Sequence, residues 1–190
     1  MNKVYIFFAD GFEEIEGLTV VDLLRRAGIE IVMVSVNGNI YVTGSHHITV
    51  ETDAVFESVD FTDADMLVLP GGMPGTHHLK AHEGLDRLLK EFYAKGKKIS
   101  AICAAPIVLG SKGLLQGRQA TCYPGHENDL IGACIINTAV VEDGNIITSR
   151  GMGTAIDFSL ALIKNMAGEA QAARIAGAIQ YEHYKTSPAD

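Results

Sequence analysis

The segment KISAICAAP, residues 98–106, contains the pattern that decides the fold. Its first half, residues 98–102, is a short and nearly continuous apolar run, which is typical of a strand buried on both faces of a parallel sheet. Its second half places Pro106 where the first turn of a helix tolerates a missing N–H group. The segment therefore predicts a strand, a tight turn at Cys103 and a following helix.

The same kind of apolar run recurs along the chain, at residues 4–9, 30–36 and 66–69. Helical patterns stand between and after these runs, at residues 13–27, 84–94, 154–167 and 169–181. Strands and helices in alternation predict an α/β sandwich around a mostly parallel sheet. Asn37-Gly38 and Asp143-Gly144 lie between extended runs and have the composition of two-residue hairpin turns, so a few antiparallel strands are also expected.

The composition narrows the class of protein. A length of 190 residues with 47% hydrophobic content suits one continuous core, so we expect a single domain over residues 1–190. The formal net charge of -8 argues against a nucleic-acid partner. The first apolar run stops at Asp10, far short of the roughly 18 residues that a membrane span needs. We therefore expect a cytoplasmic protein with no membrane partner.

Cys103 stands at the junction of the predicted strand and helix, a spacing that resembles a nucleophile elbow. Such a turn needs small residues two positions away on either side, which Ala101 and Ala105 supply. The positive end of the following helix is expected to lower the pKa of the thiol and make it the reactive cysteine. The alternative is that Cys103 is a small buried core residue. Cys122 and Cys134 lack this context, so packing roles are predicted for them.

Glu16 is unusual because it shares one face of a predicted helix with the apolar residues Val20 and Ala27. A carboxyl group on such a face either keeps its proton to higher pH or pairs with a donor. In the protonated form it can donate a hydrogen bond to a thiolate. The alternative is that Glu16 only complements the helix dipole, which is the role expected of Glu13 and Glu14.

The loop Pro70-Gly71-Gly72 follows the predicted strand at residues 66–69. Ligands of open α/β sheets bind at the carboxyl ends of the strands, where this loop lies together with residues 10–16 and 103–106. Glycine lets backbone N–H groups point into such a site, so Gly71 and Gly72 are candidates for binding an oxyanion. The alternative is an ordinary strand-to-helix turn. The loop matches neither the GxGxxG nor the GxxxxGK pattern, so no nucleotide cofactor is predicted.

The seven histidines raise the question of a metal ion or a catalytic base. His46-His47 and His77-His78 are adjacent and lack the i, i+4 spacing of a helical ligand pair, so we assign them to the surface and predict no metal site. His126 differs, because it follows Cys122-Tyr123-Pro124-Gly125 in a loop that could reach Cys103. A Cys-His pair there would support hydrolysis.

Four motifs carry a resemblance to a known superfamily: ADGFEEIE at residues 9–16, LPGG at 69–72, AICAAP at 101–106 and TSRGMGT at 148–154. They make the chain resemble the DJ-1/ThiJ/PfpI superfamily from about residue 3 to residue 167, and most of all its DJ-1 branch with the bacterial ThiJ-like proteins. The resemblance implies a flavodoxin-like three-layer sandwich that forms homodimers. It also implies that Cys103 is an oxidisable nucleophile to which Glu16 hydrogen-bonds. Gly72 and the Ala104 backbone N–H would form an oxyanion pocket beside it.

The same resemblance implies an activity. Members of the superfamily are assigned cofactor-free conversion of methylglyoxal to lactate, and deglycase activity on glycated proteins and nucleotides is also attributed to them. We therefore expect a cofactor-independent cysteine enzyme that uses Cys103 and Glu16 on methylglyoxal or its adducts in stress protection. The alternative is a redox-sensing, chaperone-like protein in which Cys103 is oxidised to the sulfinic acid. Because both readings use the same thiol, turnover is what separates them.

The sequence departs from the DJ-1 branch at two positions. Tyr123 stands where the branch commonly has a histidine, and His46 stands where it has an arginine, whereas the helix arginine is retained as Arg26. Anion binding near the dimer contact is therefore expected to be weaker. Tyr123, His126 and Arg26 are candidates for lining the pocket. Ala104 replaces the histidine that follows the cysteine in the protease-like PfpI branch, which disfavours proteolysis.

Overall fold

A computed structural model of the protein describes residues 3–183, and a seven-stranded sheet forms its centre. Its strands are β1 (Lys3–Phe8), β2 (Glu30–Ser35), β5 (Ala54–Val55), β6 (Met66–Leu69), β7 (Lys98–Ile102), β10 (Val140–Asp143) and β11 (Ile146–Ser149). They lie in the order β10-β11-β7-β6-β1-β2-β5, and every neighbouring pair is parallel except β10 and β11. Strands β2, β1, β6, β7 and β11 thus follow the 2-1-3-4-5 order of flavodoxin-like sheets, which confirms the expected fold class.

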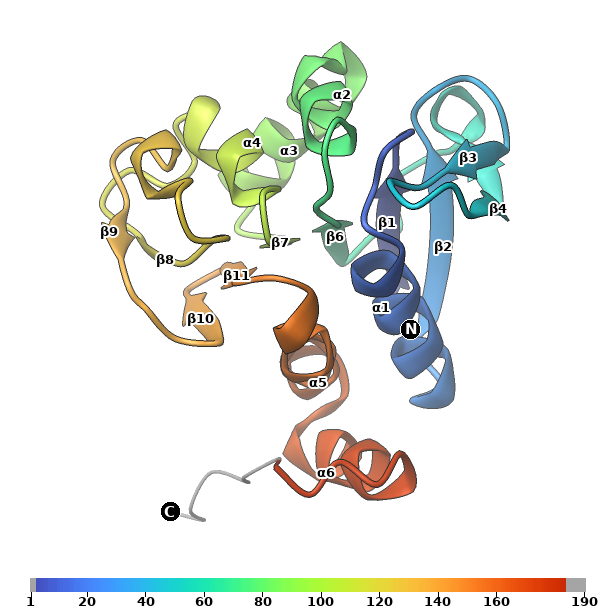
Figure 1. The fold of residues 1–190 in the computed structure, drawn as a ribbon, viewed down its shortest axis with the longest axis vertical. Coiled ribbons are helices and arrows are strands. Elements are labelled where there is room, and N and C mark those ends of the chain that lie inside the picture. The colour runs from blue at the N-terminus through green and yellow to red at the C-terminus, as the bar shows by residue number, and fades with distance from the viewer. Residues whose placement is uncertain (1–2, 184–190) are drawn as a thin grey trace.

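Helices cover both faces of this sheet and complete a three-layer sandwich (Figure 1). One face carries α1 (Glu14–Arg26), α5 (Ala155–Ala167) and α6 (Glu169–Ala178). The other face carries α2 (Gly75–Ala81), α3 (Glu83–Ala94) and α4 (Pro106–Ser111). Short 3-10 turns lie at η1 (Phe56–Ser58), η2 (Glu127–Asp129) and η3 (Met152–Thr154). Each face of the sheet has its own hydrophobic core, so the predicted burial of the strands on both sides is confirmed.

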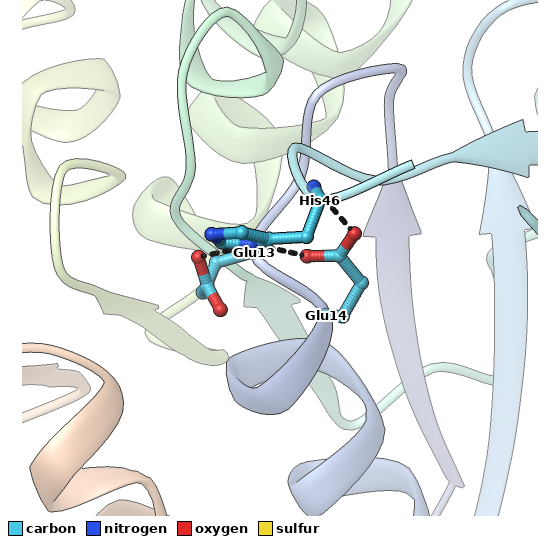
Figure 2. Close-up of side chains that lie close together, drawn as sticks. All are labelled: Glu13, Glu14 and His46. Atoms are coloured by element: carbon cyan, nitrogen blue, oxygen red, sulfur yellow. Dashed lines mark hydrogen bonds and ion pairs between the residues drawn. The ribbon is translucent and has the colours of Figure 1, made fainter. Parts of the chain in front are cut away.

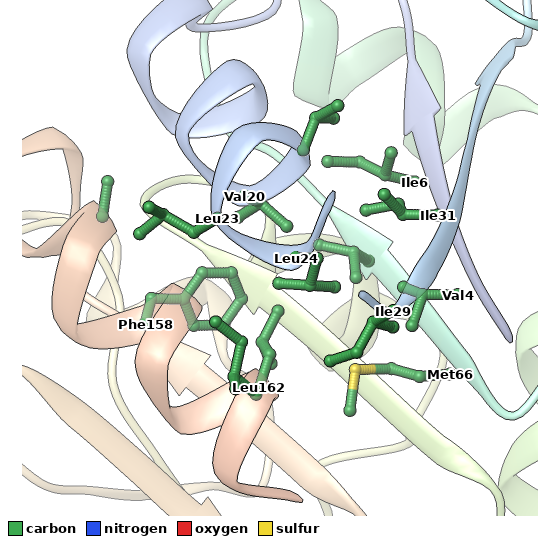
Figure 3. Packing of buried hydrophobic residues seen from close by; sticks show 14 of the residues in the cluster. Val4, Ile6, Val20, Leu23, Leu24, Ile29, Ile31, Met66, Phe158 and Leu162 are labelled. Carbon is green, nitrogen blue, oxygen red and sulfur yellow. The ribbon is translucent and has the colours of Figure 1, made fainter. Parts of the chain in front are cut away.

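The core beneath α1 positions the residues that matter for function. Successive strand residues enter opposite cores: Ile102 of β7 packs on the α1 face and Ala101 on the α3 face. Figure 3 shows the first of these cores, in which α1 and α5 meet β1, β2 and β6 through Val20, Leu23, Leu24, Phe158, Leu162, Val4, Ile6, Ile31 and Met66. Because burial of one such side chain contributes about 1.5–3 kcal/mol, this packing holds the first turn of α1 against the sheet.

One of the two predicted hairpin turns is confirmed and the other is wrong. Asp143-Gly144 joins the antiparallel strands β10 and β11. Asn37-Gly38 does not join a hairpin, because β2 pairs with β5 and the next strand, β3 (Tyr41–Thr43), pairs with β4 (Thr49–Glu51) in a separate sheet. The Asn37 side chain accepts a hydrogen bond from the backbone N–H of Asn39 at 2.9 Å, which turns the chain away from the sheet.

The last helix is shorter than the sequence pattern predicts. The predicted helix at residues 169–181 ends at Ala178 in α6, because Gln180 adopts a left-handed φ of 57°. The Tyr181 amide then donates to the Ala176 carbonyl at 2.9 Å, which closes the helix end. The sequence did not predict α2, nor the small sheet of β8 (Gln119–Ala120) and β9 (Cys134–Ile135).

Within residues 3–183, no helix is both long enough and apolar enough to cross a bilayer.

Candidate active site

Three sequence segments that were predicted to carry ligand-binding residues meet at one edge of the sheet. Strands β1, β6 and β7 are parallel neighbours, so their carboxyl ends lie side by side. Glu16 lies in the first turn of the helix that follows β1, Gly71 and Gly72 follow β6, and Cys103 follows β7. The reversal of strand order between β1 and β6 makes this edge the expected ligand position of the fold.

Cys103 adopts the strained backbone conformation that its position predicts. Its φ is 64°, in the left-handed region that is rare for residues other than glycine. The Cys103 amide donates to the Ser149 carbonyl at 2.9 Å, and its carbonyl accepts from the Tyr123 amide at 2.8 Å. Pro106 begins α4 as predicted. The residue is half-buried, so the alternative of a sealed core cysteine does not hold.

Glu16 lies on the buried face of α1, as its spacing with Val20 and Ala27 predicts. The Gly71 amide donates to its Oε2 at 2.9 Å. Its Oε1 is buried and has no hydrogen-bond partner among the described residues. Burial raises the pKa of the carboxyl to about 7, although interactions with Cys103 and the Gly71 amide act in the opposite direction. Glu16 is therefore poised to exchange a proton near neutral pH.

The two glycines after β6 let the backbone come close to the sulfur. A Cβ on Gly71 would lie 2.6 Å from both Cys103 Cβ and Glu16 Oε2, so no side chain fits there. Gly72 has a φ of +92°, and a Cβ there would collide with the backbone of Glu13. The backbone N–H groups of Gly72 and Ala104 face the Cys103 sulfur and act to lower its pKa. They are thus directed at the position where negative charge would develop.

The helix dipole was predicted to lower the pKa of Cys103. This prediction is wrong, because the pKa is raised overall. Burial raises this pKa above its ordinary value, and the neighbouring Glu16 carboxylate raises it further. The helix that follows, α4, has only 6 residues, and its amides do not outweigh these effects. Two acids in contact share one negative charge, so a Cys103 thiolate forms when Glu16 takes the proton.

Known sequences and structures resemble this chain over most of its length. Residues 2–165 match the DJ-1/PfpI family. The chain belongs to this family. The DJ-1 homolog B of Arabidopsis thaliana is 35% identical over 178 residues, which span 93% of this chain and 41% of that protein. The chain therefore spans less than half the length of that relative.

Two further matches cover most of both chains. A Pyrococcus abyssi protein named as a deglycase is 36% identical over 153 residues, which span 80% of this chain and 91% of that protein. The structure described as oxidized DJ-1 of Toxoplasma gondii has a TM-score of 0.93 and 36% sequence identity. That match covers 96% of this chain and 100% of the other. Fold and family are thus shown by independent comparisons.

Of the three candidates for lining the DJ-1/PfpI pocket, only Tyr123 adjoins Cys103. The Tyr123 ring lies 3.2 Å from where a Cβ on Gly151 would stand, and that position is 3.9 Å from the Cys103 sulfur. His126 instead pairs with Asp129 at 3.3 Å, and no hydrogen bond joins it to Cys103 within the described chain. A Cys-His pair is therefore not formed.

Arg26 lies at the far end of α1 from the cysteine. It is the last residue of the helix, exposed, and bonded to Asp22 at 2.6 Å. Ten residues separate it from Glu16, which is about 15 Å along a helix at about 1.5 Å per residue. The structure does not bring Arg26 to the pocket.

His46, in the loop between β3 and β4, contacts Glu13 and Glu14 at the start of α1 (Figure 2), and the sequence did not predict this contact. His46 Nδ1 lies 2.8 Å from Glu14 Oε2 and 3.6 Å from Glu13 Oε2. Burial raises the pKa of Glu14, but hydrogen bonds from the His46 side chain and from backbone amides outweigh it and lower the pKa to about 2. The same contact raises the pKa of His46. Glu14 is thus buried and ion-paired, beyond the dipole role expected of it.

Glu13, Glu14 and His46 are also the only side chains in residues 3–183 that bring three possible metal-ligand atoms within 4.8 Å of one another. The His46 ring nitrogen and the Glu14 carboxylate already satisfy each other as an ion pair. No local sequence pattern reveals the contact, because His46 and Glu14 are separated by 32 positions.

The remaining cysteines and histidines divide between confirmed and wrong predictions. Cys122 is 3% exposed, which confirms its packing role. Cys134 is exposed, so the packing role predicted for it is wrong, because β9 pairs only with β8 and is not covered by either core. The histidine pairs are exposed as predicted: His46, His47, His77 and His78.

Proposed function

We propose that this protein is a cofactor-independent cysteine enzyme that acts on 2-oxoaldehydes such as methylglyoxal, or on their adducts. The observation that carries the proposal is the arrangement around Cys103. A half-buried thiol in a strained turn contacts a buried carboxyl whose pKa is about 7, and two backbone amides face the sulfur. A nucleophile, a base and an oxyanion pocket together are what addition to a carbonyl requires.

The first half of the reaction forms a covalent adduct. Glu16 takes the thiol proton, and the Cys103 sulfur attacks the aldehyde carbon. The oxyanion that develops is stabilised by the amides of Gly72 and Ala104. Glu16 then returns the proton to this oxygen and completes a hemithioacetal. The pKa of about 7 at Glu16 suits both directions of proton transfer.

The second half moves hydrogen and releases the acid. The Glu16 carboxylate removes the proton from the former aldehyde carbon and returns it to the neighbouring carbonyl carbon, while the hydroxyl proton passes to the second oxygen. The product of this isomerisation is a thioester of a 2-hydroxy acid on Cys103. Water hydrolyses the thioester, which releases lactate from methylglyoxal and restores the thiol. The unpartnered Oε1 of Glu16 is the atom available for the carbon proton.

The names of the relatives support carbonyl chemistry at this site. The Pyrococcus abyssi relative is named a deglycase and is 36% identical to this chain over 153 residues. Removal of an adduct would use the same attack of Cys103 on the carbonyl-derived carbon. Methylglyoxal is the simplest probe of that attack.

The test is steady-state production of lactate from methylglyoxal, with trace metals removed. Cys103→Ser is expected to lower the rate by about 10³-fold or more while circular dichroism stays unchanged. Cys134→Ser is the matched control, because this cysteine is exposed on a different sheet. An undiminished rate in Cys103→Ser would overturn the proposal.

A second candidate function is redox sensing at the same sulfur. A sulfinate on Cys103 would be held by the amides of Gly72 and Ala104 and by protonated Glu16. The Toxoplasma gondii relative was solved in a form described as oxidized. Mass spectrometry after graded peroxide is expected to show oxidation at Cys103 before Cys134. The reverse order would count against sensing, and lactate production at a useful rate would place catalysis first.

The resemblance to DJ-1 proteins also leads us to expect a homodimer. A groove of about 520 Å³ runs along α1 and is lined by apolar side chains that include Ile15 and Ile48. These two side chains are 50% and 54% exposed, and exposed apolar patches often mark protein contacts. Sedimentation at micromolar concentration tests this, and a strictly monomeric species would contradict it.

A further inference from the structure

The backbone of Arg150 lies next to that of Cys103 in the fold. Strands β11 and β7 are parallel, and their register places Ser149 opposite Ile102. The Cys103 amide donates to the Ser149 carbonyl at 2.9 Å, so the pairing continues up to the nucleophile. Since paired strands lie about 4.8 Å apart, Arg150 follows its strand at the same edge where Cys103 follows its own.

A groove lies at this edge of the sheet, and one of its lining residues, Gly151, faces Cys103. The groove has a volume of about 270 Å³ and is lined by Tyr123, Pro124 and residues 150–154. Gly151 connects it to the nucleophile, because a Cβ there would lie 3.9 Å from the Cys103 sulfur. No acidic side chain lines the groove. A ligand held by Cys103 can therefore extend over Gly151 towards Arg150.

Arg150 is the one arginine whose side chain makes no hydrogen bond or ion pair within residues 3–183. The other five arginines of the chain are engaged with neighbours: Arg25, Arg26, Arg87, Arg118 and Arg174. Arg150 is only partly exposed. A guanidinium is always charged and offers five donors in a planar fork that matches a carboxylate.

Among residues 3–183, the nearby acids form no hydrogen bond or ion pair with Arg150. Burial raises the pKa of Cys122 to about 11, and the charge of Arg150 acts against this rise. Glu127 and Asp129 also act on Cys122. Glu127 accepts from the Gly125 amide and Asp129 pairs with His126, so neither is bonded to Arg150. In a protein of net charge -8, Arg150 thus offers a positive charge with no partner among residues 3–183, in the groove next to Gly151.

We propose that Arg150 binds an anionic group of the substrate, and that the substrate class is a 2-oxoaldehyde that carries a carboxylate. The inference rests on the proposed function, which it makes more specific. Cys103 takes the aldehyde carbon, the chain lies over Gly151, and the guanidinium of Arg150 receives the carboxylate as a bidentate pair. Neutral methylglyoxal would use only the reacting half of this site.

The probe is 4,5-dioxopentanoate. Its aldehyde and carboxylate carbons are separated by four carbon–carbon bonds of about 1.5 Å, which gives about 5 Å in an extended chain. A ligand of this length reaches from the thiol across Gly151 to the end of the neighbouring strand, since neighbouring strands lie about 4.8 Å apart. One water is consumed and 2-hydroxypentanedioate is formed, by the same transfer of hydrogen from the aldehyde carbon to its neighbour, with no change in overall redox state.

The kinetic test compares kcat/KM for 4,5-dioxopentanoate with kcat/KM for methylglyoxal. Arg150→Gln is expected to lower this ratio by about 10–100-fold, mainly through KM, and Arg150→Lys is expected to restore part of it because the charge remains. Arg174→Gln is the matched control, since Arg174 lies on α6, and should keep the wild-type ratio. An unchanged ratio in folded Arg150→Gln overturns the inference while turnover of methylglyoxal leaves the proposed function standing.

A binding test separates the two proposals. Cys103→Ala cannot turn over, and calorimetry with 2-hydroxypentanedioate and with lactate reads the anion site directly. The dicarboxylate is expected to bind at least about tenfold more tightly than lactate, and Arg150→Gln in the same background should remove the difference.

Such binding without turnover of any 2-oxoaldehyde would contradict the proposed function and retain the anion site. Equal affinities in both backgrounds would overturn the anion site. If Arg150→Gln does not fold, Arg150→Lys provides the test. This variant is expected to bind the dicarboxylate more weakly than the parent protein does, but still more tightly than it binds lactate.

Discussion

Glu14 and Glu16 stand two positions apart in the first turn of α1, and both are buried, yet their pKa values move in opposite directions. Burial raises the pKa of each. Glu14 also receives hydrogen bonds from the ring and backbone of His46, which lower its pKa to about 2. Glu16 receives one backbone amide, from Gly71, and this donor together with Cys103 only partly offsets burial, so its pKa is raised to about 7. The number of donors decides whether a buried carboxyl keeps its charge or exchanges a proton.

This contrast assigns different tasks to the two carboxyls. Glu14 holds the loop between β3 and β4 against α1 and contributes to stability. Glu16 stores and returns a proton beside Cys103 and contributes to the proposed chemistry. Each of the following substitutions changes one member of the comparison and leaves the other in place.

The largest effect is expected for Glu16→Gln on turnover. Gln keeps an acceptor for the Gly71 amide but cannot take the thiol proton, so the rate with methylglyoxal should fall by about 10²–10⁴-fold. Glu14→Gln is the control, and its loss should be far smaller because Glu14 faces His46 rather than the sulfur. Equal losses of lactate production in the two variants would break the assignment.

The second effect is on the pH dependence of stability. A pKa raised in the folded state adds stability that is complete below the unfolded pKa and is lost as pH rises through the folded value. For Glu16 the window runs from 4.5 to about 7, and the loss is on the order of 3 kcal/mol. Urea unfolding of the wild type should show this fall, and Glu16→Gln should not. Parallel pH profiles would show that the pKa is not raised.

The third effect is the stability that Glu14 contributes. Glu14→Gln is expected to lower the free energy of unfolding by about 1.5–3 kcal/mol at pH 7, because hydrogen bonds to a charged group are lost. A lowered pKa gives stability above the unfolded value of 4.5 that disappears as pH falls towards about 2. The difference between Glu14→Gln and the wild type should therefore shrink at pH 3. A constant difference would contradict the ion pair.

The smallest effect is expected for His46→Gln. The contact with Glu14 raises the pKa of His46, so its contribution is present at low pH and is lost as pH rises through the folded value. The ring is mostly exposed, so the shift of the urea midpoint at pH 6 should be smaller than that of Glu14→Gln, and it should vanish at high pH. His47→Gln is the matched control. An equal shift in that variant would show that the loop does not depend on the ion pair.

The sequence predicts most features that depend on residues close together in the chain. The strand, turn and helix at residues 98–106, the strain at Cys103 and the apolar face that carries Glu16 all follow from short-range spacing, and the structure confirms each. Asn37-Gly38 failed because a turn signal does not say which strands pair. Cys134 failed because exposure depends on which strand covers β9.

The ionisation state of the site lay outside the reach of local patterns. Helix position predicts a lowered pKa for Cys103, but the net effect is set by burial and by Glu16, a residue 87 positions away that the sheet brings into contact. The ion pair between Glu14 and His46 has the same origin, since 32 residues separate them. Electrostatic effects depend on distance through space and on desolvation, and neither can be read from neighbours in the chain.

Residue order thus supplied the elements, the nucleophile and the family, because backbone preferences and hydrophobic periodicity act over a few positions. Three-dimensional packing decided the electrostatics: Glu14 became an ion-paired carboxylate, Glu16 became a group that exchanges a proton near neutral pH, and Arg150 was left without a partner among residues 3–183, in the groove next to Gly151. Those properties arise between segments that are distant in the sequence, and only the folded sheet with its helices brings these segments together.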